Sequence, residues 1–157
     1  MHSRIFQISE QPIQQEDYIN ETYFYDHWFL NRIADYVNDD TDRQDDIEWL
    51  KTCCSDDGIS FGEDKDGAFL IIEDKHKFFE KSFARFQECL SNLLNKTLDD
   101  FISYSMSMDM YRLNNSYNDD CGFYTYHDGE LVTFDEFVRY YKTNTKYYFG
   151  ATIDYHY

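Results

Sequence analysis

The chain has few residues that would break it into flexible segments. It contains one proline and six glycines in 157 residues, and no proline- or glycine-rich stretch divides it. A chain of this length is most simply one domain, and it can bury about two-thirds of its unfolded surface without a disulfide or a metal. The sequence therefore predicts one acidic domain over residues 1–157.

Long apolar runs are also lacking. The longest covers residues 68–72, far short of the roughly 20 residues of a membrane-spanning helix. The first residues show no apolar core of a secretory signal. No Cys-x-x-Cys pair occurs, and free thiols are typical of a reducing compartment. We therefore expect a cytoplasmic protein that makes no membrane contact. The four cysteines are Cys53, Cys54, Cys89 and Cys121.

Motifs for catalysis are missing as well. The sequence has no nucleophile elbow and no glycine-rich phosphate loop, and no histidine stands at ligand spacing from another histidine or a cysteine. Asp64 and Asp66 would fit the third and fifth positions of a calcium loop that ends at Glu73, but the first position would be Gly62, which has no carboxylate. We predict a non-enzyme without cofactor or metal. A plain hairpin turn is the preferred interpretation of residues 64–67, and a calcium site is the alternative.

Aromatic residues and negative charge are what the chain has in excess. Aromatics make up 20% of the residues, which predicts a folded protein, because disordered acidic chains lack them. There are 31 acidic and 14 basic residues, for a net charge of -17. Residues 1–64 hold 16 acids against 4 bases, residues 65–97 hold 5 against 6, and residues 98–157 hold 10 against 4. Such a field repels nucleic acid and anionic membranes and attracts basic proteins.

Hydrophobic periodicity predicts an α+β fold. Strict alternation over residues 146–157 predicts a strand with one buried face, and an apolar stripe with 4-3-4-3 spacing predicts a helix over residues 74–95. That stripe, which we assign to the core, comprises Phe79, Phe83, Phe86, Leu90 and Leu93. Because most strands come in hairpins, we expect a mainly antiparallel sheet built from hairpins, with helices packed on one face. The predicted strands are 3–9, 59–63, 68–73, 122–126, 130–132 and 146–157, and the predicted helices are 28–38, 42–54, 74–95, 98–115 and 133–141.

The strongest candidate site is the acidic segment of residues 35–57. On one continuous helix, Asp35, Asp39, Asp42 and Asp46 would lie on one face, about 6 Å apart, which resembles the spacing of phosphates on a nucleic-acid strand. A capping box at Thr41 would break this row, and a solvated acidic face is the alternative. Tyrosine and tryptophan are favoured interface anchors. The predicted partner-binding residues are Asp35, Asp39, Asp42, Asp45, Asp46, Glu48, Asp56, Asp57, Tyr25 and Trp28.

These features favour an inhibitor that acts as a nucleic-acid mimic. It would occupy the basic nucleic-acid-binding surface of a nuclease or defence complex, as an anti-restriction or anti-CRISPR protein or as an immunity protein against a toxin. The expected partner is a basic protein, a nucleic-acid-handling enzyme, rather than nucleic acid itself. The alternative is a non-catalytic protein–protein adaptor or accessory domain with an aromatic-rich surface. An enzyme that uses paired acids is a third hypothesis. The oligomeric state stays open.

Overall fold

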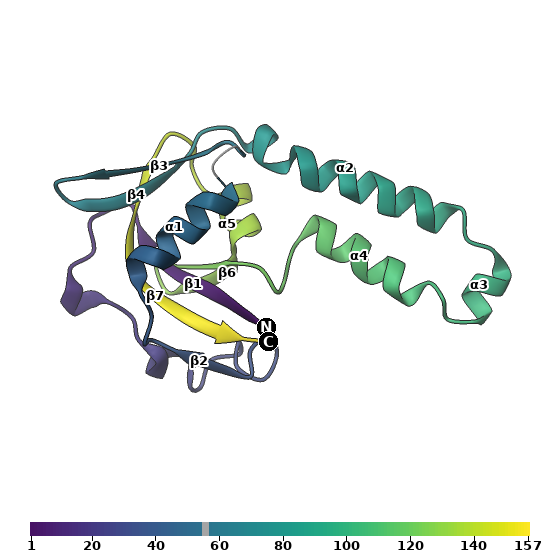
Figure 1. The fold of residues 1–157 in the computed structure, drawn as a ribbon, viewed down its shortest axis with the longest axis horizontal. Coiled ribbons are helices and arrows are strands. Elements are labelled where there is room, and N and C mark those ends of the chain that lie inside the picture. The colour runs from purple at the N-terminus through teal and green to yellow at the C-terminus, as the bar shows by residue number, and fades with distance from the viewer. Residues whose placement is uncertain (55–56) are drawn as a thin grey trace.

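The computed structural model describes residues 1–54 and 57–157 (Figure 1). In chain order the elements are β1 (His2–Ser9), the 3₁₀ helices η1 (Gln15–Asp17) and η2 (Glu21–Phe24), β2 (Tyr36–Asn38), α1 (Arg43–Cys54), β3 (Ile59–Asp64), β4 (Gly67–Ile72), α2 (Lys75–Leu94), α3 (Leu98–Ile102), α4 (Ser107–Tyr117), β5 (Tyr124–His127), β6 (Glu130–Thr133), α5 (Phe134–Tyr140) and β7 (Lys146–His156).

The strands form one mixed, mostly antiparallel sheet. Its order is β3-β4-β7-β1-β5-β6, with β2 paired to the end of β7, and among the pairings between these strands, in the residues that the structure describes, only β1–β5 is parallel. The hairpins β3–β4 and β5–β6 turn at Gly67 and Gly129, whose φ angles of 126° and 87° favour glycine. The α+β class and the mostly antiparallel sheet are therefore confirmed.

Two apolar clusters form the core. One joins Phe6, Leu70 and Phe149 of the sheet to side chains of α1 and α5, and the other joins Ile5 and Ile153 to the segment around Phe24 and Phe29. The central strand β7 contributes to both, and its residues 147–153 are buried without interruption. The expectation that β7 has one buried face is therefore wrong, because a strand in mid-sheet is covered on both faces.

The predicted helix over residues 28–38 is also wrong. This segment consists of turns, an isolated bridge between Leu30 and Ala34, and β2. Asn31 has a φ of 71°, in the left-handed region, and the backbone N–H of Asp35 donates to the carbonyl of His156. Ile33 and Val37 pack into the second cluster from an irregular chain that pairs with β7, whereas Tyr36 is exposed.

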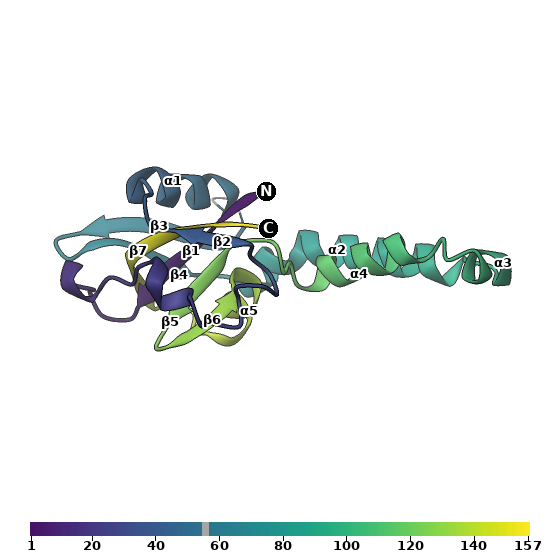
Figure 2. The same cartoon turned by 90° about the horizontal axis from the view of Figure 1, so that it is seen from below.

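The helices α2, α3 and α4 project from the sheet as a hairpin (Figures 1 and 2). We call residues 75–117 the arm and the rest of the chain the body. No residue of α2 is fully buried, and Phe83 and Leu90 of the predicted core stripe are exposed. Assigning the whole stripe to the core is therefore wrong: Phe79, at the start of α2, packs against the first cluster, but in the described residues the main element along the rest of α2 is α4.

The predicted helix over residues 98–115 is divided in two. Between α3 and α4, the hydroxyl groups of Ser103 and Ser105 both donate to the carbonyl of Asp100, and Tyr104 has a φ of 60°. Serine side chains compete in this way with the helical hydrogen bonds. Thr97 begins α3 and Thr133 begins α5, each with the reciprocal hydrogen bonds of a capping box.

Candidate partner-binding surfaces

The residue that caps the start of α1 is not the one predicted. The Asp42 carboxylate accepts the backbone N–H groups of Gln44 and Asp45 at 3.0 and 3.2 Å, so Asp42 caps the helix. The hydroxyl of Thr41 instead lies 2.8 Å from that of Thr152 on β7. The expected capping box at Thr41 is therefore wrong, because that side chain anchors the segment to the sheet.

The expected row of four carboxylates on one helix face does not form. Residues 36–38 are a strand, and α1 begins only at residue 43. Asp35 lies at the end of β7, with its carboxylate 3.1 Å from Nδ1 of His156. The row is broken because β2 must extend to pair with β7.

Asp46 is not available to a partner. It is 5% exposed, and its Oδ1 lies 2.6 Å from Nε of Arg4 on β1. The Arg4 guanidinium also pairs with Asp154 of β7 and lies over the ring of Trp49. The prediction that Asp46 contacts a partner is therefore wrong, because this carboxylate fixes α1 to the sheet.

Two other predicted acids have cationic neighbours. Glu48 is exposed and pairs with Lys51 at 3.1 Å, one turn along α1. Asp57 pairs with Lys81 of α2 at 2.6 Å. Asp56 lies outside the described residues. The carboxylates of Glu48 and Asp57 therefore each have a lysine that neutralises their charge at short range.

The remaining acids form an exposed surface before and within the first turn of α1. We call Asp39, Asp40, Asp42 and Asp45 the acidic surface; all four are exposed. Within residues 1–54 and 57–157, none of them has a lysine or arginine nitrogen within 4.0 Å. Because no cation neutralises them at short range, these four carboxylates project a negative field into solvent.

Of the two predicted aromatic contacts, Tyr25 lies beside the acidic surface. Its hydroxyl donates to the Glu21 carboxylate at 2.6 Å, and the backbone N–H of Glu21 donates to Asp39 at 3.4 Å. The hydrogen bond to Glu21, with further repulsion from Asp39, raises the pKa of Tyr25 above its ordinary value. Trp28 is exposed, and its ring contacts are with His27 and Phe29 of its own loop.

The turn between β3 and β4 is a hairpin in which an ion pair engages Asp64. The Asp64 carboxylate accepts hydrogen bonds from Lys146 at 2.5 Å and from the hydroxyl of Tyr148 at 3.0 Å. Strands, not helices, flank the turn. In the described part of the chain, no group of three or more His, Cys, Asp or Glu side chains is placed to hold a metal ion.

Asp64 makes stability depend on pH. The hydrogen bond from Lys146 lowers the pKa of Asp64 to about 2. A carboxyl group with a lowered folded-state pKa stabilises the fold above its unfolded-state pKa of about 4, and it loses that contribution as pH falls toward 2. We expect Asp64→Asn to be less stable than the parent at pH 7 and this difference to shrink strongly as the pH falls to about 2, as measured by urea unfolding. A difference that is as large at pH 2 as at pH 7 would contradict this assignment.

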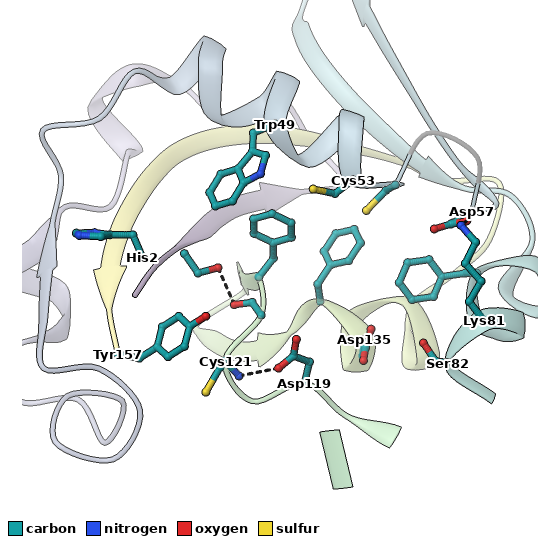
Figure 3. Close-up of a pocket in the computed structure, with 16 residues that line it drawn as sticks. His2, Trp49, Cys53, Asp57, Lys81, Ser82, Asp119, Cys121, Asp135 and Tyr157 are labelled. Atoms are coloured by element: carbon teal, nitrogen blue, oxygen red, sulfur yellow. Dashed lines mark hydrogen bonds and ion pairs between the residues drawn. The ribbon is translucent and has the colours of Figure 1, made fainter. Parts of the chain in front are cut away.

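A cavity of about 430 Å³ lies between α1, α5 and the first turns of α2 (Figure 3). Trp49, Asp135 and Cys121 line it from three different segments. Burial raises the pKa of Asp135 above its ordinary value and the pKa of Cys54 to about 12. Cys54 therefore stays a protonated thiol at neutral pH and is not an activated nucleophile.

The exposed apolar surface of the arm is what the sequence reasoning missed. Three of the four methionines, Met106, Met108 and Met110, fall within five residues of the arm. Methionine is common at adaptable binding surfaces, so this clustering was the signal that could have identified the arm as a surface element.

No protein-family model, curated protein or solved structure matches this chain. Of the helices described, none combines the length and apolar character needed to cross a membrane. The two surfaces that a partner could bind are the acidic surface of the body and the exposed apolar surface of the arm.

Proposed function

We propose that this protein is a non-catalytic inhibitor that binds the basic nucleic-acid-binding surface of an enzyme through its acidic surface. The uneven distribution of charge carries the proposal. The arm holds six bases and five acids, a net charge of +1, which leaves -18 on the rest of the chain. A concentrated field of this sign steers a basic partner into fast association and repels nucleic acid.

The manner of mimicry follows from the broken row. The acidic surface lies on a loop and the first turn of α1, so its carboxylates do not copy a phosphate backbone atom by atom. It binds a basic cleft through charge complementarity instead. Anti-restriction, anti-CRISPR and toxin-immunity proteins all fit this mode of action. The proposal includes a cytoplasmic setting, supported by four cysteines that form no disulfide. It also includes helices α1 and α5 covering one face of the sheet, supported by their shared apolar cluster.

Reversing the acidic surface tests this function. We expect Asp39→Lys/Asp40→Lys/Asp45→Lys to weaken partner binding by about 10- to 100-fold, because charge complementarity supplies the attraction. The parent protein is immobilised and used to capture a basic nuclease from host lysate at low salt, which a salt gradient then elutes. The activity of this nuclease on duplex DNA is assayed in the presence of the parent or of the variant.

The matched control carries the same change of net charge at a distance from the acidic surface. It is Glu63→Lys/Glu73→Lys/Glu130→Lys, at three exposed positions, and it should bind and inhibit nearly as well as the parent. Equal loss in both variants would show that net charge alone matters. Unchanged binding in both would reject the acidic surface as the contact.

The second candidate is the protein–protein adaptor, favoured by the exposure of Tyr23, Tyr25 and Trp28. Large exposed aromatic side chains supply contact area that salt does not screen. If this candidate is correct, the alanine variants of these three residues abolish binding while the lysine variants retain it, and the captured partner resists elution by salt.

A further inference from the structure

One flank of the arm carries a continuous apolar surface. On α2, Phe83, Leu90 and Leu94 are separated by seven and four residues, which places them on one side of the helix. On α4, Met110 and Tyr117 are seven residues apart. Their exposed fractions range from 40% to 78%. Phe83 and Tyr117 line the same groove, so both rows lie on the same side of the hairpin. We call these five residues the apolar flank.

The two ends of the arm are complementary in apolar character: the tip projects exposed apolar side chains, and the base has an aromatic-lined groove. At the tip, Leu98, Phe101, Ile102 and Tyr104 are each more than 70% exposed. At the base, a groove of about 230 Å³ lies between α2 and the end of α4. Aromatic rings of Phe79, Phe83, Phe86 and Tyr117 line it, with the guanidinium of Arg139 over two of them. The tip therefore offers apolar side chains of the kind that the groove at the base accepts.

The two ends are complementary in charge as well. Residues 75–85 at the base hold four bases and one acid, a net charge of +3, whereas residues 97–105 at the tip hold two acids and no base. An arm that lies antiparallel on a second arm brings the acidic tip of each to the basic base of the other. This sign pattern favours another copy of the same arm as the occupant of the apolar flank.

The acidic bodies disfavour the opposite orientation. Parallel arms would place two bodies of charge -18 side by side. Antiparallel arms hold the bodies at opposite ends of α2, whose 20 residues span about 30 Å. That separation is several times the Debye length of about 8 Å at physiological salt, so the repulsion between the bodies is largely screened.

We propose that two copies of this chain associate through their apolar flanks, antiparallel, as a four-helix bundle in which the tip of each arm enters the base groove of the other. The contact is two-fold symmetric and therefore closed, as in most homodimers. A face about 30 Å long and two helices wide, about 20 Å, has an area of roughly 600 Å² when it is treated as flat. Side chains that project from this face raise the buried area toward the ~800 Å² per partner of a stable interface, so the area is sufficient.

Sedimentation of the full chain tests the association. We expect a dimer at micromolar concentration, and we expect Leu94→Lys/Phe101→Lys to raise the dimer dissociation constant at least about 100-fold. Both side chains are exposed in the monomer, so the fold should survive, which circular dichroism checks. The lysines also bring positive charge to the basic base of the other copy.

The control variant alters equally apolar and exposed residues on other sides of α4. Met108 lies two positions from Met110, about 200° around the helix, and Tyr111 lies opposite the side that packs on α2. We expect Met108→Lys/Tyr111→Lys to remain dimeric. A parent chain that is monomeric at about 100 µM overturns the proposal, as does equal dissociation of both variants. A monomeric parent whose capture of the basic nuclease requires Leu94 and Phe101 would show that the arm binds that enzyme instead.

Spin labels test the orientation. A label is attached at Leu98→Cys in a chain whose native cysteines are replaced by alanine and whose dimeric mass is verified. Antiparallel arms predict a distance between the two tips of about 30 Å or more. A distance under about 20 Å, two helix spacings, would show parallel arms and overturn the proposed insertion of the tip into the groove.

Discussion

Replacing Arg4 with methionine is expected to lower the free energy of unfolding by about 3–5 kcal/mol, because it leaves a buried carboxylate without its counter-charge. Asp46 is 5% exposed, and Arg4 is its ion-pair partner at 2.6 Å. Its second oxygen, Oδ2, is buried without a hydrogen-bond partner among the described residues. The same guanidinium pairs with Asp154, so two acids in a strongly acidic protein lose their cation together.

Urea unfolding at pH 7 measures this effect, with two comparison variants. Arg32→Met removes the same charge from an exposed site and should change stability by less than about 0.5 kcal/mol. Arg4→Met/Asp46→Leu removes both members of the pair and should recover at least half of the loss, because an apolar pair carries no uncompensated charge. If the double variant is no more stable than Arg4→Met, packing rather than charge explains the role of Arg4.

Elements with a local chemical signal could be predicted from the sequence. The hairpin β3–β4 depends on a glycine with positive φ at residue 67, and the start of α5 depends on the reciprocal hydrogen bonds of Thr133 and Glu136. Each signal lies within a few residues of the structure that it specifies. The strand β1 and the helix α1 were also predicted, from apolar periodicity within each segment rather than from a correct turn or cap.

Features that depend on distant partners could not be predicted in this way. Asp45 and Asp46 are neighbours in sequence, yet only Asp46 faces Arg4, which is 42 residues away along the chain. The stripe on α2 has the same spacing whether it packs in a core or on another chain. The many aromatic side chains of the chain lie in two environments. In the body they pack ring against ring, whereas the arm exposes several of its rings.

The loop that contains Trp28, a predicted partner contact, also contains Phe29, whose truncation we expect to have one of the largest effects on stability. Phe29 is fully buried, with its ring centroid 4.9 Å from that of Tyr124 and 5.0 Å from that of Tyr155. Truncation to alanine leaves a cavity between the loop and the sheet, and such changes cost about 3–5 kcal/mol. We expect Phe29→Ala to lose this much stability in urea unfolding.

The adjacent residue supplies the control. Trp28 is 47% exposed, and Trp28→Ala should cost no more than about 1 kcal/mol, as for most changes outside a core. If the two variants lose equal stability, Trp28 is part of the packing, and loss of binding on its removal would not identify a contact. If only Phe29→Ala is strongly destabilised, Phe29 fastens the loop to the sheet and leaves Trp28 free at the surface. Any loss of partner binding in Trp28→Ala then reports on the contact itself.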